Sequence, residues 1–221
     1  LMFKQLNEAR SEVFYYRQNS AASHMDDRFV NEFEFKDAKI LHLTGITPAL
    51  SEKCEGLTLK FAEKAKSEGI MFSFDPNIRK KLWKRKDFAP LLRELSLKAD
   101  IVLMGEEEGR ELLDVNTAEK MIDVILSQGK ASYIAIKQGA KGAVVSSRNY
   151  MMFIPPYPCH CVDSIGAGDA FNAGFLTGIL EEKSIEDCGK LAAMAGALAT
   201  ESFGDIEGYP TRKQLEERML E

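Results

Sequence analysis

Residues 163–171, with the sequence DSIGAGDAF, form the most specific chemical pattern in this chain. Gly166 and Gly168 flank Ala167 just before an expected helix, so successive backbone N–H groups can converge there on an anion. Asp169 follows at the mouth of that helix, where a carboxylate can take the proton of a hydroxyl that attacks a phosphoryl group. The segment therefore predicts an anion hole beside a general base. Asp169 as a simple helix cap is the alternative, because Asp is common there.

Polar and turn-forming residues also follow four expected core strands. The strand over 38–44 leads into Gly45, the strand over 70–75 into DPNIR, the strand over 100–104 into GEEE, and the strand over 133–137 into KQG. Ligands of open α/β sheets bind at the carboxyl ends of the strands. These strand exits are therefore expected to lie at one edge, which favours that edge as the active site.

The strands alternate with stretches of helical periodicity, which predicts an α/β fold. Helices are expected over 51–68, 86–98, 107–113, 117–128, 168–182, 185–200 and 211–220, with short strands over 142–146 and 150–154. Apolar strands alternating with helices are typical of a mostly parallel sheet covered on both faces. Right-handed crossovers then give a three-layer α/β/α core over residues 38–221.

The first 37 residues look different from this core and are expected to form a separate small β element. Strands are predicted over 1–6 and 12–16, around a polar turn. A lone hairpin is marginally stable in water and needs a sheet to join. We therefore expect residues upstream of Leu1 to be absent.

Small residues recur at intervals of four in two of the expected helices. They are Ala170, Gly174 and Gly178 in the first, and Ala192, Gly196 and Thr200 in the second. Small side chains let helix backbones approach closely. The two helices are therefore predicted to pack face to face.

Composition argues against several classes of protein. The formal charge of −5 provides no basic field for nucleic acid. No apolar run is long enough to span a bilayer, and the start of the chain lacks the plan of a signal peptide, so we expect a cytosolic protein. Cys159-His160-Cys161 resembles part of a metal site, but structural zinc needs four ligands and a second cluster is missing. These thiols are expected to be buried or half-buried on a strand.

The segment DSIGAGDAF resembles the signature D-T-x-G-A-G-D-x-F of the ribokinase (PfkB) family of carbohydrate kinases, with Ser164 in place of Thr. Within that family, five segments are similar to the 2-keto-3-deoxygluconate kinases. They are FYYR at 14–17, NSAAS at 19–23, LHLTGI at 41–46, FDPNIR at 74–79 and GDIEGYPT at 204–211. The resemblance covers essentially the whole chain and implies a ribokinase-like fold.

The resemblance also implies roles for single residues. The catalytic base would be Asp169, and the anion hole would come from Gly166, Ala167 and Gly168. The nucleotide would contact Asn77, Arg79, Lys137, Gly139 and Gly142. The substrate would contact Tyr15, Arg17, Arg79 and Asp205. ATP would be the phosphoryl donor, and Mg²⁺ would be held through water by Glu108.

The chain departs from the family pattern at two points. Many relatives have Asn-x-x-Glu after the third strand, whereas here Gly105 replaces the Asn and Glu108 keeps the carboxylate. The family also opens with a strand, a Gly-Gly substrate loop and most of a β lid that are not found here. Residues 1–37 would then be a remnant of the lid and its substrate hairpin. We expect residues 1–221 alone to bind ATP weakly and to phosphorylate sugar slowly, if at all.

Together these patterns predict an ATP- and Mg²⁺-dependent kinase that converts 2-keto-3-deoxygluconate to its 6-phosphate. A sugar acid carries a carboxylate, which guanidinium groups such as those of Arg17 and Arg79 bind in bidentate fashion. A fructokinase or another ribokinase-like sugar kinase is the nearest alternative. An inactive fragment that serves as a binding or structural module is the alternative from another class. The partners expected are the sugar acid, ATP and a second copy bound through the β lid.

Overall fold

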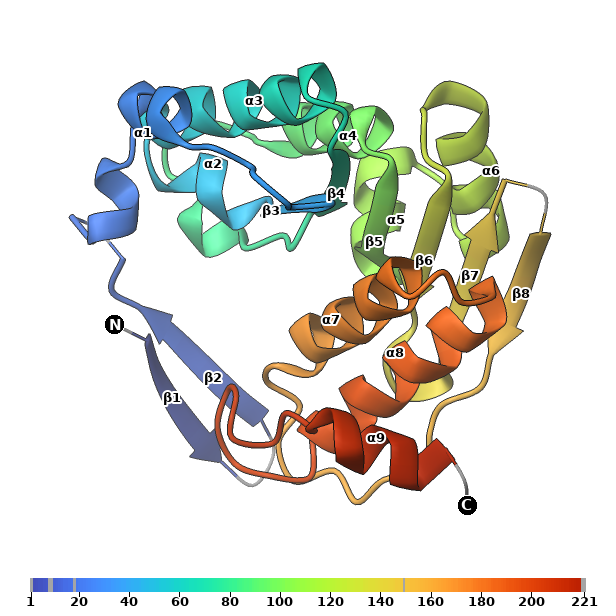
Figure 1. Ribbon diagram of the computed structural model, residues 1–221. Helices are drawn as coiled ribbons and strands as arrows, with labels where there is room; N and C mark the ends of the chain where they lie inside the picture. The colour runs from blue at the N-terminus through green and yellow to red at the C-terminus, as the bar shows by residue number, and fades with distance from the viewer. Residues whose placement is uncertain (1, 8–9, 18, 149, 220–221) are drawn as a thin grey trace.

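The computed structural model describes residues 2–7, 10–17, 19–148 and 150–219. A six-stranded sheet runs through its centre in the order β3-β4-β5-β6-β7-β8 (Figure 1). The strands are β3 (Ile40–Thr44), β4 (Met71–Asp75), β5 (Ile101–Gly105), β6 (Tyr133–Lys137), β7 (Ala143–Ser147) and β8 (Tyr150–Ile154). Strands β3 to β6 are parallel, while β7 and β8 are antiparallel to their neighbours. The predicted mostly parallel sheet is confirmed.

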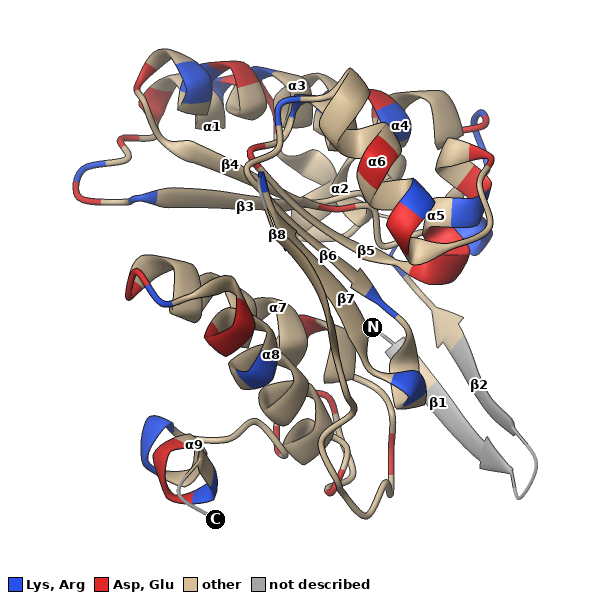
Figure 2. Ribbon diagram, turned by 90° about the vertical axis from the view of Figure 1, so that its right-hand side faces the viewer, with Lys and Arg blue, Asp and Glu red and all other residues tan. Residues whose placement is uncertain are grey.

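Helices cover both faces of this sheet, which makes the predicted three layers (Figure 2). One face carries α3 (Glu52–Ser67), α4 (Ala89–Lys98), α5 (Glu106–Leu113) and α6 (Ala118–Gln128). The other carries α7 (Ala167–Leu180) and α8 (Ile185–Ala199), with α9 (Arg212–Met219) beside α8. Along β5, Val102 and Met104 pack into the hydrophobic core beneath α4 and α6. Ile101 and Leu103 pack into the core beneath α7 and α8. Because successive side chains of a strand point to opposite faces, a strand between two helical layers must be apolar throughout.

Helices α7 and α8 meet along their small residues, as predicted. A Cβ atom on Gly174 would lie 2.9 Å from the Cα of Ala192, and one on Gly178 would lie 2.8 Å from Cys188 Sγ. Backbones this close leave no room for larger side chains. The seam fixes the position of α7, the helix that begins at the predicted anion hole.

The N-terminal segment contains the predicted hairpin, but it is not all β. Strands β1 (Met2–Asn7) and β2 (Arg10–Tyr15) form a separate antiparallel pair, and residues 8–9 of the predicted turn lie outside the described residues. A 3-10 turn (Ala21–His24) and α1 (Asp27–Glu32) follow, so the expected all-β segment was wrong for residues 21–32. Asp26 caps α1, and Val30 of this helix packs against the apolar side of α3. The boundary at residue 37 stays a prediction.

Two further features differ from the sequence-based expectation. A short helix, α2 (Ile46–Leu50), precedes α3, and the sequence analysis missed it. Cys159 and Cys161 are exposed in the loop after β8, so their predicted place on a strand was wrong. Among the described residues, no group of three or more His, Cys, Asp or Glu side chains could hold a metal ion. In the same part of the chain, every helix is too short or too polar to cross a membrane.

Candidate active site

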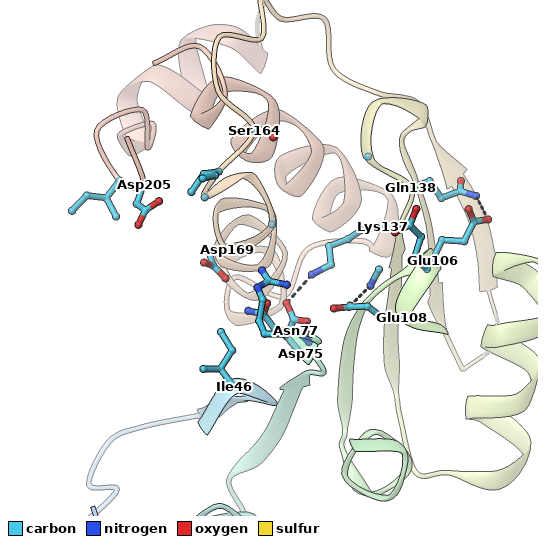
Figure 3. Close-up of a pocket in the computed structure, with 18 of the residues that line it drawn as sticks. Ile46, Asp75, Asn77, Glu106, Glu108, Lys137, Gln138, Ser164, Asp169 and Asp205 are labelled. Atoms are coloured by element: carbon cyan, nitrogen blue, oxygen red, sulfur yellow. Dashed lines mark hydrogen bonds and ion pairs between the residues drawn. The ribbon is translucent and has the colours of Figure 1, made fainter. Parts of the chain in front are cut away.

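A cavity of about 960 Å³ opens at the carboxyl ends of the parallel strands (Figure 3). Its lining comes from the hairpin, the exits of β4, β5 and β6, the start of α7 and the loop before α9. The predicted site residues that line it are Tyr15, Arg17, Asn77, Arg79, Glu108, Lys137, Gly139, Gly166, Gly168, Asp169 and Asp205. Ala167 and Gly142 lie outside this lining. Gly142 is buried under the end of β8.

The turn before α7 has the backbone geometry that an anion hole needs. Gly166 is the N-cap of the helix and has a left-handed φ of +80°, which favours glycine. A Cβ atom there would lie 2.1 Å from the carbonyl oxygen of Asp205, and the Tyr209 hydroxyl donates a 3.2 Å hydrogen bond to the Gly166 carbonyl. Asp163 is buried and accepts a 3.0 Å hydrogen bond from the backbone N–H of Ile165. Contacts from both sides therefore hold the turn in place.

Asp169 is the third residue of α7, and its side chain is exposed to the cavity. Among the described residues, its carboxylate has no hydrogen-bond or ion-pair partner. The helix is capped by Gly166, so the alternative in which Asp169 only caps the helix was wrong. A carboxylate without a partner beside a helix N-terminus can accept a proton from a hydroxyl in the cavity.

Three buried or half-buried side chains form a closed polar network next to Asp169. The Lys137 Nζ donates hydrogen bonds to Asp75 Oδ2 at 2.7 Å and to Asn172 Oδ1 at 3.1 Å. The Asn172 Nδ2 donates to Asp75 Oδ2 at 2.6 Å. The remaining oxygen of Asp75, Oδ1, accepts a 3.0 Å hydrogen bond from the backbone N–H of Asn77, whose φ is +40°. This network joins β4, β6 and α7 at the edge of the cavity.

Glu108 faces the same cavity from the first turn of α5. Its Oε1 accepts a 2.7 Å hydrogen bond from the backbone N–H of Ile78, and its Oε2 accepts one of 2.8 Å from Gly105. Burial raises the pKa of the Glu108 carboxyl, and the nearby Asp75 adds to that shift. The carboxylate thus ties the end of β5 to the segment that follows β4. One carboxylate together with substrate phosphates is a common binding arrangement for Mg²⁺.

Two arginines line the cavity, Arg17 from the segment after β2 and Arg79 from the loop after β4. The Arg17 guanidinium lies over the Tyr15 ring at 4.8 Å from its centroid. Arg79 is exposed, and its Nη1 donates a 3.0 Å hydrogen bond to the Ile78 carbonyl. Both guanidinium groups keep donors available for a bound anion.

Two residues of the polar network, Asp75 and Asn172, were not predicted as site residues from the sequence. Asp75 was visible as the last residue of a strand before Pro76. Asn172 is a polar residue within an otherwise apolar helical stretch, three positions after Asp169. Residues three apart on a helix share a face, and this spacing was the available signal.

The fold and cavity together place a glycine turn at a helix N-terminus beside an exposed carboxylate, an arrangement suited to an anion next to a hydroxyl. The sequence pattern of the pfkB family of carbohydrate kinases matches residues 2–212, and the chain belongs to this family. It is 35% identical over 217 residues to a 2-dehydro-3-deoxygluconokinase of Bacillus subtilis, covering 97% of this chain and 67% of that protein.

Other members of the family are also similar. A protein of Arabidopsis thaliana named "Probable fructokinase-5" is 31% identical over 222 residues, covering 96% of this chain and 68% of the relative. The crystal structure of a sugar kinase from Pyrococcus horikoshii in complex with ATP has a TM-score of 0.79 and 27% identity, with coverage of 98% and 68%. The carbohydrate kinase class is thus established, while these relatives differ in the sugar that their names give.

Proposed function

We propose that this chain carries the catalytic core of an ATP-dependent kinase that phosphorylates 2-keto-3-deoxygluconate at its 6-hydroxyl. The observation that carries the proposal is the position of Asp169 directly beside the Gly166–Gly168 turn. Its carboxylate is exposed and has no hydrogen-bond or ion-pair partner among the described residues. A hydroxyl between this carboxylate and a phosphoryl group in the turn is set for in-line attack. The polar network places the Lys137 ammonium at the same edge, paired with the Asp75 carboxylate.

The proposed transfer needs little covalent chemistry from the protein. The sugar oxygen forms a bond to the γ-phosphorus of ATP while its proton passes to the Asp169 carboxylate. The bond from that phosphorus to the bridging oxygen breaks, and ADP leaves with the electron pair. Backbone N–H groups at Gly166, Ala167 and Gly168 stabilise the charge on the phosphoryl oxygens. Gly139, beside Lys137, lies on the nucleotide side of the cavity, and Gly142 shapes the turn behind it.

A carboxylate on the substrate accounts for the two cavity arginines. Arg17 and Arg79 carry two positive charges into the cavity, and Arg79 can also meet the nucleotide phosphates, whereas Arg17 would have no anion beside a neutral sugar. Tyr15 supports Arg17 through its ring, and Asp205 offers an acceptor for sugar hydroxyls. A fructokinase is the second candidate, because fructokinases are among the similar proteins.

Mg²⁺ fits the site as a partner of the bound phosphates. Glu108 has both oxygens engaged by backbone N–H groups, and each carboxylate oxygen retains a lone pair that can contact a metal-bound water. When bound, the ion would neutralise part of the phosphate charge. The remaining contributions, namely orientation, proton acceptance and anion stabilisation, come from the residues of the chain.

A single-turnover assay tests the proposal, since it detects slow transfer as well as fast. The 221-residue protein is placed in excess over radiolabelled ATP with Mg²⁺ and either 2-keto-3-deoxygluconate or fructose. Asp169→Asn should lower the rate about 10²- to 10⁴-fold while calorimetry gives unchanged ATP affinity. Asp123→Asn, at an exposed carboxylate on α6, is the matched control and should leave the rate unchanged.

The substrates separate the alternatives. Transfer to the sugar acid supports the proposal, and transfer to fructose alone would favour the fructokinase. ATP binding without transfer to either sugar would favour the binding module. An Asp169→Asn variant that keeps more than about a tenth of the wild-type rate would contradict the assigned base.

A further inference from the structure

Asn172 occupies an unusual place in the middle of α7. It lies one turn beyond Asp169 and is only 3% exposed. Both the oxygen and the nitrogen of its side-chain amide make hydrogen bonds. The Oδ1 atom accepts from Lys137 and the Nδ2 atom donates to Asp75. Asn is a poor helix former, and a buried amide that is not fully hydrogen bonded is costly. The two hydrogen bonds therefore have to offset the cost of burying Asn172 in a helix.

Those partners are the charged ends of two residues that line the cavity. Asp75 and Lys137 belong to the described lining, whereas Asn172 lies behind them. The orientation of the amide is determined by the charges on either side. Turning it around would place N–H groups against the Lys137 ammonium and an oxygen against the Asp75 carboxylate. Asn172 can therefore act on the site only through these two neighbours.

The arrangement leaves Lys137 with one donor for the cavity. An ammonium has three N–H groups, and Asp75 and Asn172 accept two of them. The Nζ atom lies against the first turn of α7, because a Cβ atom on Gly168 would be 4.0 Å from it. The third N–H is thus available beside the turn where the backbone N–H groups converge.

We infer that Asn172 is a positioning residue that, with Asp75, holds the Lys137 ammonium so that its remaining N–H meets the transferred phosphoryl group. This inference rests on the proposed kinase function. Without the Asn172 oxygen, the ammonium would be drawn entirely toward the Asp75 carboxylate and away from the anion site. The expected loss is in the rate of transfer more than in the binding of the sugar.

Other charged groups surround this network and must be considered in any test that varies pH. Glu108 of α5 interacts electrostatically with Asp75 and Lys137. His42 of β3 does so with Asp75, Lys137 and Asp169, the last of which lies on α7 itself. These groups are common to wild type and variants, so the ratio of the variant rate to the wild-type rate isolates position 172.

Asn172→Asp gives the sharpest test. A protonated carboxyl can reproduce the amide, because its hydroxyl donates to Asp75 and its carbonyl accepts from Lys137. The ionised form cannot donate and places a second buried carboxylate against Asp75. Burial and the neighbouring Asp75 favour the protonated form, and they outweigh Lys137 because Asp75 already balances its charge. Relative to wild type, kcat should therefore fall reversibly by about tenfold or more from pH 5.5 to pH 8.

Two further variants complete the design. Asn172→Leu, which has a similar volume and no hydrogen bonds, should lower kcat about tenfold or more at every pH, with KM for the sugar changed less than about threefold. Ala173→Asp adds a carboxylate to the exposed face of the same helix and should show no new pH dependence. If Asn172→Asp fails to fold, the comparison of kcat with KM in Asn172→Leu decides the question.

Nucleotide affinity provides a readout that does not depend on the sugar. The ratio of ATP to ADP affinity, measured by calorimetry with Mg²⁺, should fall with rising pH in Asn172→Asp relative to wild type at the same pH. If wild type phosphorylates neither sugar, the proposed function fails, and this ratio still tests the contact with the terminal phosphate. Wild-type behaviour of both Asn172 variants, or a loss in Asn172→Asp that is independent of pH, would overturn the inference.

Discussion

Replacing Lys137 by Met should destabilise the protein as well as impair transfer, because it leaves a buried carboxylate without its cation. The Lys137 and Asp75 side chains are 16% and 5% exposed, with 2.7 Å between Nζ and Oδ2. At an effective dielectric constant of about 20, unit charges about 4 Å apart attract by roughly 4 kcal/mol and closer charges by more, and breaking a buried pair costs about 3–5 kcal/mol. Asp75 keeps hydrogen bonds from Asn77 and Asn172, so we expect the low end, about 3 kcal/mol.

For a chain of this size, that loss corresponds to a decrease in Tm of about 6–12 °C. Urea unfolding followed by the fluorescence of Trp83, the single tryptophan, measures the change in free energy. The double variant Lys137→Met/Asp75→Asn removes the stranded charge. It should recover at least half of the lost stability, while transfer stays impaired because the ammonium is still missing.

The double-mutant cycle measures the interaction between Lys137 and Asp75 directly. If Lys137→Met alone changes the free energy of unfolding by less than about 1 kcal/mol, the pair is not a buried, mutually dependent one. If the two substitutions are additive within about 0.5 kcal/mol, the two side chains do not interact as described. Recovery of stability together with recovery of transfer would remove Lys137 from the catalytic role.

Four other substitutions probe the site. Arg17→Met and Arg79→Met should each raise KM for the sugar acid by about ten- to 150-fold and change KM for fructose much less, and equal increases would favour a fructokinase. Gly166→Ala should lower Tm and abolish transfer, because left-handed strain of about 1–2 kcal/mol adds to a clash with a backbone carbonyl. Gly69→Ala carries the same strain at φ +71° without the clash and is its control. The half-buried Glu108 has a raised pKa, so its contribution to stability falls as pH rises above the ordinary value of about 4.3. In urea unfolding, Glu108→Gln should therefore gain stability relative to wild type from pH 4.5 to 7, and a constant difference would contradict this.

The fold could be predicted from the sequence because its strands are short apolar runs between amphipathic helices. The segment IVLM of β5 is buried on both faces, so its pattern was unambiguous. Helix α1 was missed because its six residues gain their stability from contacts such as that of Val30 with α3, which no local pattern reveals. Helix α2 was missed because Pro48 lies in its first turn and reads as a break.

The candidate site was predictable where local rules apply and unpredictable where partners come from distant segments. The exits of the parallel strands had to meet at one edge, which placed Asn77 and Lys137 together. The pairing of Asp75 with Asn172 joins residues 97 positions apart, and nothing in the spacing of either residue announces it. Gly142 was expected among the nucleotide contacts, but it is buried beneath the end of β8 and does not reach the cavity.

The order of the strands in the central sheet also has a consequence for how the protein is made. Each strand from β3 to β8 pairs with the next one along the chain, so the sheet can grow by local steps as the polypeptide leaves the ribosome. Helices α7 and α8 emerge afterwards, and until then the face that carries Ile101 and Leu103 has no cover. A released chain that ended before residue 167 would therefore display the sheet with one bare apolar face, a form that chaperones bind and that aggregates readily. Asp75 would also wait for Asn172 until that last stretch had been synthesised, so the chemical site and the second layer are completed together.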